Sequence, residues 1–483
     1  MNKVSFRNVI HIISISLVFE SLFIFTCLPV AWYYNETTII PIFKSFLITF
    51  LSGFFGFLFT RKNVTEYSVK DTFFSVVLTW ITISLFGSLP YLSSASIPSF
   101  VDAFFETVSG FTTTGASILK DIEIIPKSIL LWRAETHWIG GMGIIVLVIA
   151  FLPYFKVGGQ HLMMAEGSFF NSEKIRSRTI DVAKRMWFIY LILTIMQILL
   201  MTIAGMDFFD SVCHSFATIA TGGFGTKNSS MIQYSPLIQY IVITFMTLSG
   251  MNFTLHYLFV HGRFKKVFSN EEMKAYLLII LASSLIITFI NKSSFNITWE
   301  KSFRDALFQV SSLITATGFV SSDYELWPHS AQWVLFLIML IGACVGSTGG
   351  GIKVARYVIA FKKLKSYILK TLNPNSVYIP KYNGQSYSPE VSTGIISYIF
   401  IYYSTIVIGS FILILCGLDK VSACGAVTTT LGGIGPGFNE VGAIDNFSQV
   451  SSFGKLYLSF NMILGRLEIM SFLIILVPSF YKK

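Results

Sequence analysis

Four short segments of the chain combine glycine with threonine or other small residues, and each is set in a polar gap between long apolar stretches. They read GFTTTGAS (Gly110–Ser117), IATGGFGT (Ile219–Thr226), LITATGFVSS (Leu313–Ser322) and TTLGGIGPGF (Thr429–Phe438). Glycine lets a backbone approach an axis closely, and carbonyl or hydroxyl oxygens can replace the water around a dehydrated cation. Because the segments carry no charged residue, they favour a monovalent cation such as K⁺, whereas a ring of carboxylates would hold a divalent ion.

The spacing of these segments predicts a repeated unit. The central glycines Gly115, Gly223, Gly318 and Gly435 are separated by 108, 95 and 117 residues, which is room for two membrane helices and a loop. One chain with four such loops can close them around one axis. A single segment of this kind would be typical of a helix crossing, but four at similar spacing favour a pore.

A fifth glycine-rich segment lies inside an apolar stretch: GACVGSTGGGIKVAR (Gly342–Arg356). So many glycines cannot form a stable straight helix, so we expect the helix to break just inside the third loop, where a flexible polar segment could form a gate. The rival interpretation is a phosphate-binding loop, but the Gly-x4-Gly-Lys-Ser/Thr pattern is absent.

Arg466 lies within the last apolar stretch, NMILGRLEIMSFLIIL. A charge inside a membrane helix usually faces a cavity or a partner. Arg466 could therefore face the pore and raise the barrier for cations, or it could form a structural ion pair with an acid. Glu468 is a poor partner because residues two apart do not share a helix face.

The elements that must position these residues are membrane helices. The chain has 483 residues, of which 53% are hydrophobic and 12% charged, and apolar runs recur from end to end. This composition predicts an all-α polytopic membrane protein, in which an N-terminal helix pair (9–34 and 38–60) is retained and not cleaved as a signal peptide. Four units of helix, pore loop and helix would follow it. The expected outer helices are 72–92 and 129–154, 184–206 and 236–260, 274–291 and 331–360, and 390–417 and 455–480.

This arrangement gives ten spans in a single integral domain. Its parts are the helix pair (1–65) and the four repeats at 66–160, 161–265, 266–375 and 376–483. Between the two helices of each repeat lies a segment too short to cross a bilayer: Phe100–Gly110, Phe208–Ala220, Phe303–Ile314 and Val421–Thr430. An acid stands near the start of each, at Asp102, Asp210, Asp305 and Asp419. Since acids favour helix N-termini, we expect four short pore helices whose C-terminal ends point inward.

The charge pattern sets the predicted orientation. Of the 35 Lys and Arg residues, 24 fall in the termini and in alternate loops, so these segments, with both termini, are expected in the cytoplasm and the four glycine loops outside. The net charge of +10 does not gather into one basic patch, which argues against nucleic acid as a partner. The five cysteines show no metal-ligand spacing.

The motifs SGFTTTGAS, ATGGFGT, GSTGGGIKVAR, GIGPGF and LGRLE together resemble the TrkH family of potassium uptake proteins, over essentially the whole chain. The resemblance implies four repeats around one central K⁺ path. The implied filter residues are Thr113, Thr114, Gly115, Thr221, Gly222, Gly223, Ala316, Thr317, Gly318, Gly433, Ile434 and Gly435. The implied gate is the loop of Gly346, Ser347, Thr348, Gly349, Gly350 and Gly351, together with Arg466.

The resemblance also implies a homodimer with one pore per subunit, set in the lipid of the cell inner membrane. A cytosolic TrkA-type subunit would bind NAD(H) or ATP/ADP and control opening, while this chain itself would hold no cofactor and transport K⁺. Two loops depart from the family pattern: the fourth has Gly432 and Gly433 before its GPG, and the third has Ala316.

Two other classes of function compete with a pore. Glycine-broken helices also occur in alternating-access transporters of organic solutes, but these predict two inverted halves, whereas four repeats of one orientation are expected here. An ion-coupled secondary transporter, in which K⁺ flux is coupled to H⁺ or Na⁺, stays open as an alternative, although the lack of an evident intramembrane chain of Asp, Glu and His residues favours channel-like flux. A membrane-embedded enzyme would need paired acids, a histidine cluster or a nucleophile within the bilayer, and none is evident. We therefore predict transport and not catalysis.

Overall fold

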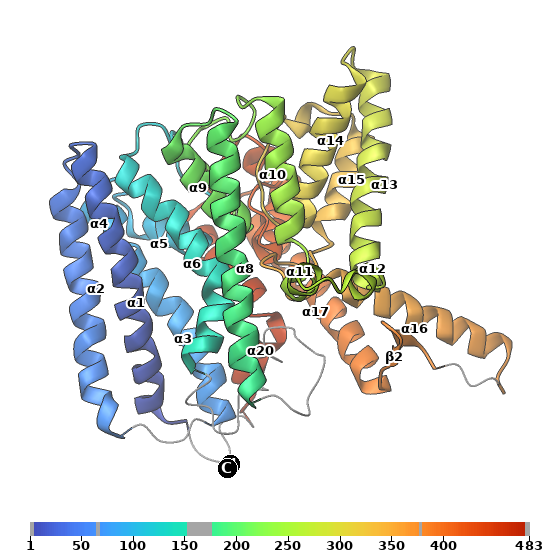
Figure 1. The fold of residues 1–483 in the computed structure, drawn as a ribbon, viewed down its shortest axis with the longest axis horizontal. Helices are drawn as coiled ribbons and strands as arrows, with labels where there is room; N and C mark the ends of the chain where they lie inside the picture. The colour runs from blue at the N-terminus through green and yellow to red at the C-terminus, as the bar shows by residue number, and fades with distance from the viewer. Residues whose placement is uncertain (1–3, 64–67, 152–175, 376–378, 479–483) are drawn as a thin grey trace.

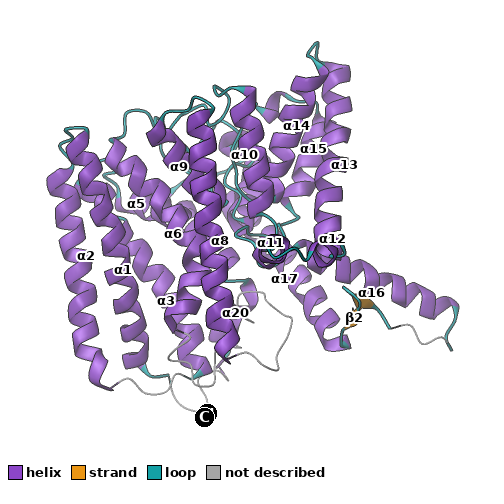
Figure 2. Ribbon diagram, viewed as in Figure 1, coloured by secondary structure: helices purple, strands orange, loops and turns teal. Residues whose placement is uncertain are grey.

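The structure is a computed structural model that describes residues 4–63, 68–151, 176–375 and 379–478. Helices make up nearly all of its regular structure (Figure 2). The first two, α1 (Phe6–Tyr33) and α2 (Ile39–Thr60), form the predicted N-terminal pair, and the short turn η1 (Arg61–Asn63) follows them. They stand side by side at one edge of the molecule (Figure 1).

The helices after this pair fall into four consecutive sets. The first holds α3 (Val69–Gly87), α4 (Leu89–Ser93), α5 (Phe100–Phe111) and α6 (Lys127–Phe151); the second α8 (Arg176–Ile203), α9 (Phe208–Ile219), α10 (Pro236–Ser249) and α11 (Phe253–Val260). The third holds α12 (Phe264–Phe268), α13 (Glu271–Ser294), α14 (Trp299–Ile314), η2 (Tyr324–Leu326), α15 (His329–Met339) and α16 (Val354–Leu372). After the hairpin of β1 (Lys381–Tyr382) and β2 (Gln385–Ser386), the fourth holds α17 (Pro389–Leu415), α18 (Lys420–Gly432), η3 (Asn439–Val441), η4 (Phe447–Gln449), α19 (Ser452–Arg466) and α20 (Ile469–Leu476).

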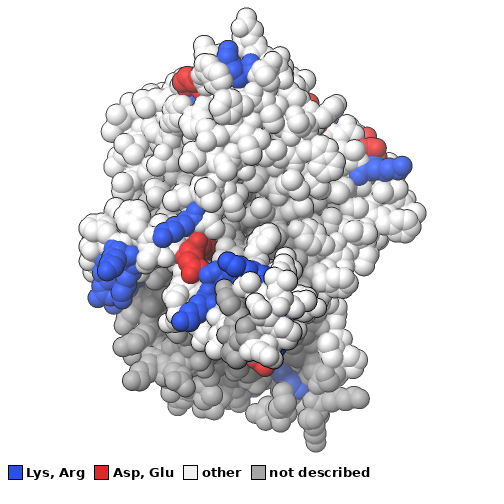
Figure 3. All heavy atoms as spheres, turned by 90° about the vertical axis from the view of Figure 1, so that its right-hand side faces the viewer, with Lys and Arg blue, Asp and Glu red and all other residues white. Residues whose placement is uncertain are grey.

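The predicted polytopic all-α class is confirmed. Six of the described helices are long and apolar enough to cross a membrane, and the bent pair α10–α11 would make a seventh span. On the face in Figure 3, charged side chains lie near the top, at the right edge and in a lower band, with a broad uncharged field between them. Such a belt matches a surface that meets lipid tails.

Two of the predicted outer helices are wrong as continuous spans. The one predicted at 236–260 bends by 100° between α10 and α11, because Asn252 leaves the helix and accepts a hydrogen bond from Thr254 N–H at 2.8 Å, which starts a new helix. The one predicted at 455–480 breaks at Glu468, whose φ is +58°. The break predicted in 331–360 is present between α15 and α16.

The four predicted short helices are present as α5, α9, α14 and α18. Each begins at a side-chain cap, namely Ser99, Asp207, Thr298 and Asp419. One detail of the acid pattern is wrong. Because α14 begins at Trp299, four residues before the predicted Phe303, Asp305 lies beyond its first turn and Glu300 is the acid there.

Candidate functional site

The four short helices end in the same backbone geometry. In each, the amide of the residue that follows a left-handed residue bonds back to a carbonyl five residues earlier: Thr114 to Ser109 (2.9 Å), Gly222 to Ala217 (2.8 Å), Thr317 to Ser312 (2.8 Å) and Ile434 to Thr429 (2.8 Å). This bond is the mark of a Schellman cap, whose preceding residue is left-handed. The four left-handed residues are Thr113, Thr221, Ala316 and Gly433, with φ from +54° to +68°.

This geometry explains the departure seen in the fourth loop. A left-handed conformation costs an L-residue about 1–2 kcal/mol and costs glycine almost nothing. The loops that follow the first three short helices therefore hold strained residues at this position, whereas Gly433 after the fourth is unstrained. We define loops 1 to 4 as residues 112–116, 220–224, 315–319 and 432–436.

The four loops meet in a closed ring. Each left-handed residue is followed, two positions on, by a glycine of positive φ: Gly115, Gly223, Gly318 and Gly435. A Cβ added at each glycine would lie within 3.0 Å of a carbonyl oxygen in the next loop, in the order Gly115 to Gly222, Gly223 to Thr317, Gly318 to Ile434 and Gly435 to Thr114. Because loop 4 returns to loop 1, the order closes on itself. The structure thus brings all twelve residues predicted for the filter into one ring.

The polarity of the short helices suits a cation at this ring. Their C-terminal ends lead into it, and a helix C-terminus carries about half a negative charge. At the far end of α18, the side chain of Asp419 accepts hydrogen bonds from Val421 N–H (3.0 Å) and Ser422 N–H (3.3 Å). The bond from Ser422 N–H is the main reason that the pKa of Asp419 lies below its ordinary value. A charged acid therefore stabilises the helix end away from the ring.

The side chains of the ring are less symmetric than its backbone. In loop 1 the hydroxyls of Thr112 and Thr114 lie 2.8 Å apart, and in loop 3 those of Thr315 and Thr317 lie 2.7 Å apart. The matching positions in loops 2 and 4 carry no hydroxyl. Loops 1 and 3 are opposite in the cyclic order, so the hydroxyl pairs give the ring a twofold pattern.

A buried ion pair joins loops 1 and 2 from behind. Arg133 of α6 bonds to Glu106 of α5 at 2.6 Å, and both side chains are at most 3% exposed. Glu106 also accepts the amide of Ile118, just after loop 1, at 2.9 Å. Arg133 donates to the carbonyl of Gly225, just after loop 2, at 2.9 Å. The pair therefore fixes the distance between two neighbouring loops.

The glycine-rich segment packs against one side of the ring. We call residues 340–353, between α15 and α16, the Gly-rich loop. Its Thr348 hydroxyl lies 3.1 Å from the carbonyl of Ile219 at the end of α9 and 3.2 Å from the hydroxyl of Thr221. A Cβ on Gly349 would meet the carbonyl of Thr315, and one on Gly350 that of Gly432. The loop thus touches the ends of α9, α14 and α18, where side chains larger than hydrogen would not fit.

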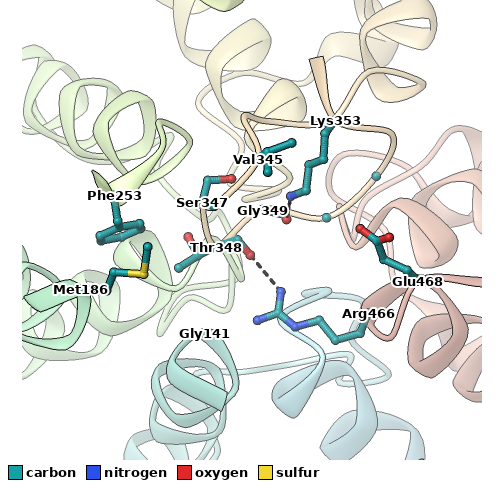
Figure 4. Close-up of a pocket in the computed structure, with 14 residues that line it drawn as sticks. Gly141, Met186, Phe253, Val345, Ser347, Thr348, Gly349, Lys353, Arg466 and Glu468 are labelled. Atoms are coloured by element: carbon teal, nitrogen blue, oxygen red, sulfur yellow. Dashed lines mark hydrogen bonds between the residues drawn. The ribbon is translucent and has the colours of Figure 1, made fainter. Parts of the chain in front are cut away.

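Arg466 holds this loop from the opposite side. Its guanidinium donates to the carbonyl of Thr348 at 2.8 Å and to that of Gly140 in α6 at 2.7 Å, as Figure 4 shows for Thr348. Glu468, the acid nearest in sequence, pairs with Arg356 at 2.6 Å. The predicted gate residues Gly346 to Gly351 and Arg466 all line one cavity of about 90 Å³.

Sequence reasoning missed two charged residues that contact the Gly-rich loop. Lys353 lines the cavity, and its ammonium bonds to the carbonyl of Gly349 (Figure 4). Lys353 stood within the quoted GGGIKVAR motif, but its neighbours there suggested only a topology signal. Glu272, which contacts the Gly-rich loop from α13, lies about 80 residues away in the chain, so no sequence signal could place it.

Comparison with known proteins identifies the family of this chain. The family model of TrkH, described as a cation transport protein, matches residues 40–481. The chain belongs to the TrkH family. Among TrkH-family relatives, the Trk system potassium uptake protein TrkH of Escherichia coli K12 is 36% identical over 431 residues, which is 88% of each chain. The protein of the same name from Vibrio parahaemolyticus is 34% identical over 99% of each chain.

A solved structure in the TrkH family extends the match to three dimensions. The crystal structure of the potassium transporter TrkH from Vibrio parahaemolyticus superposes with a TM-score of 0.89 at 34% identity. The match covers 99% of this chain and 100% of that one. This chain therefore has the fold of a TrkH-family transport protein over its whole length.

Proposed function

We propose that this chain takes up potassium ions through the ring of loops 1 to 4. The observation that carries the proposal is the closed order of carbonyls from Thr114, Gly222, Thr317 and Ile434, each facing a glycine of its neighbour. Oxygen dipoles without net charge suit a monovalent ion that must bind and leave quickly. Relatives 34–36% identical are potassium uptake proteins by name.

We further propose that the Gly-rich loop and Arg466 form the gate. The loop lies across the inner side of the ring, and Arg466 fixes Thr348 by a charged hydrogen bond of 2.8 Å. The guanidinium also places a positive charge beside the path, which repels cations. Opening would require the bond to Thr348 to break and the loop to leave the ends of α9, α14 and α18.

The setting proposed for this pore follows the sequence analysis. The four repeat units surround it in the cell inner membrane, both termini lie in the cytoplasm, and the ring faces outward. Two copies form a dimer, and a cytosolic TrkA-type subunit that binds nucleotide drives the gate. Channel-like flux is preferred to coupled transport because the sequence shows no evident intramembrane chain of Asp, Glu and His residues that resembles a proton relay.

The test is ⁸⁶Rb⁺ uptake into proteoliposomes that contain the purified protein. We expect Arg466→Ala to raise uptake and to leave the preference for K⁺ over Na⁺ unchanged, because the gate would be released and the ring kept. Uptake that is absent from both wild type and Arg466→Ala would refute potassium transport. Uptake that needs an imposed H⁺ or Na⁺ gradient would support a coupled transporter.

A further inference from the structure

Glu272 closes the base of the Gly-rich loop. This residue lies in the first turn of α13 and is only 3% exposed. One of its carboxylate oxygens accepts two amides, Val345 N–H at 2.7 Å and Ala355 N–H at 3.2 Å. Val345 precedes the segment from Gly346 to Gly351, and Ala355 follows it in the first turn of α16. A single carboxylate thus joins the two sides of the loop.

The two hydrogen bonds that Glu272 accepts differ in importance, because other bonds also close the base of the loop whereas, within the described part of the chain, no other side chain caps α16. The base of the loop also has backbone bonds from Gly342 N–H to the carbonyl of Ile352 (2.7 Å) and from Val354 N–H to that of Ala343 (3.2 Å). The amide of Ala355, however, is one of the first amides of α16, which have no partner within their own helix. The side chain of Lys353, the cap residue, accepts no hydrogen bond from these amides. Glu272 is the group that caps α16 and ties it to the loop.

The far side of Glu272 contacts the hairpin of β1 and β2. Tyr382, a residue only 7% exposed, shares a buried apolar cluster with Ala355 and Ile359 of α16, and its hydroxyl lies toward the Glu272 side chain. Two hydrogen bonds hold the hairpin in place: Asn383 accepts the amide of Glu271 at 2.8 Å, and Lys362 of α16 donates to the carbonyl of Lys381 at 2.6 Å. Figure 1 shows the hairpin, labelled at β2, next to the part of α16 that is nearer to the other helices.

We infer that Glu272 and Tyr382 form a latch that couples the hairpin to the gate. The inference rests on the proposed gating role of the Gly-rich loop and names the residues that regulate it. When the hairpin holds Tyr382 in place, Glu272 keeps both sides of the loop together and the loop stays against the ring. A displacement of the hairpin withdraws Tyr382, frees Glu272 from one or both amides, and lets the loop move.

The latch makes Glu272 a positioning residue, because it acts on the gate through the backbone of the loop. Its variants should therefore change how often the pore conducts and leave unchanged which ion the pore prefers. A residue that only supports the fold would instead lower flux and selectivity together. This difference separates the two roles in one experiment.

The experiment compares full-length variants in proteoliposomes by ⁸⁶Rb⁺ and ²²Na⁺ uptake. We expect Glu272→Ala to raise Rb⁺ uptake about tenfold, which corresponds to ~1.4 kcal/mol, with the Rb⁺/Na⁺ ratio within about twofold of wild type. Glu272→Gln keeps an acceptor oxygen and should restore uptake to near the wild-type level. Tyr382→Phe removes only the hydroxyl and should raise uptake by about two- to threefold, since Glu272 loses one polar neighbour but keeps both amide hydrogen bonds.

The control is Glu390→Ala, which removes an exposed acid in the first turn of α17 and should leave uptake unchanged. Uptake within twofold of wild type for Glu272→Ala, or a loss of ion preference with it, would overturn the latch. If Glu272→Ala does not elute as a folded protein, Tyr382→Phe decides, and unchanged uptake in that variant refutes the inference. Because Arg466→Ala tests transport by itself, a failure of the latch is distinguishable from a failure of the pore.

Discussion

A methyl group added at Gly223 should disrupt the ring of loops more than the same group at a matched site elsewhere. Gly223 has φ +81°, and a Cβ there would lie well inside 3.0 Å of the carbonyl oxygen of Thr317. Gly417 has φ +97°, and a Cβ there would meet nothing within 4 Å. Both substitutions to alanine therefore share the backbone strain, and only one adds a collision.

The magnitudes follow from these two terms. The left-handed strain is about 1–2 kcal/mol for either variant. Overpacking at a close contact adds about 1–3 kcal/mol, so Gly223→Ala should lose roughly 2–5 kcal/mol of local stability. The oxygen of Thr317 cannot yield by rotating a side chain, because it belongs to the backbone of loop 3. Loops 2 and 3 must separate, and the carbonyl ligands of both are displaced.

The assay measures ⁸⁶Rb⁺ and ²²Na⁺ uptake in parallel, with thermal unfolding as a check on folding. We expect Gly223→Ala to reduce the Rb⁺/Na⁺ ratio at least tenfold, whereas Gly417→Ala keeps both uptake and ratio within about twofold. Equal behaviour of the two variants would refute the reasoning, since it would mean that contact between neighbouring loops does not set the ligand positions.

Three further outcomes are expected. Gly433→Ala should retain transport, because three other loops hold a larger residue at that position and only the Cα of Gly350 lies near a Cβ added there. It should lose about 1–2 kcal/mol of stability from the left-handed backbone, and a loss of ion preference in uptake assays would contradict this prediction. Arg466→Lys keeps the charge but cannot bond to the carbonyls of Thr348 and Gly140 at once. Its uptake should therefore fall between those of wild type and Arg466→Ala, and a value outside this interval would argue against the gate. Arg133→Met breaks the buried pair with Glu106, so it should lower the free energy of unfolding by about 3–5 kcal/mol and weaken ion preference. Glu123→Gln breaks an exposed pair with Lys227 and should change stability by less than about 1 kcal/mol. Equal shifts of the two variants in denaturant titrations would show that the buried pair has no special role.

The elements that local pattern determines were predictable from the sequence. Apolar runs gave the helix pair α1 and α2, and short mixed segments between runs gave α5, α9, α14 and α18 within a few residues. The glycines of loops 1 to 4 also indicated their own conformation, since glycine is the residue that favours positive φ. The break before α16 followed from the density of glycine around Thr348.

Features that depend on distant contacts were beyond sequence reasoning. Glu468 bonds to Arg356, more than 100 residues away. Glu272 reaches both sides of the Gly-rich loop only because α13 packs beside α16. In each case a polar side chain finds a partner that the fold brings near, and periodicity carries no information about it.

The closed order of the loops also constrains when the protein can finish folding. Gly435 meets the backbone of Thr114, and these two residues are separated by about 320 residues of chain. At a synthesis rate of roughly 5–20 residues per second, the first loop is made about 15–60 s before its last neighbour exists. During that interval loop 1 lacks one of the two neighbouring loops that pack against its polar backbone. The ring can therefore close only after the last of the four sets of helices has been synthesised.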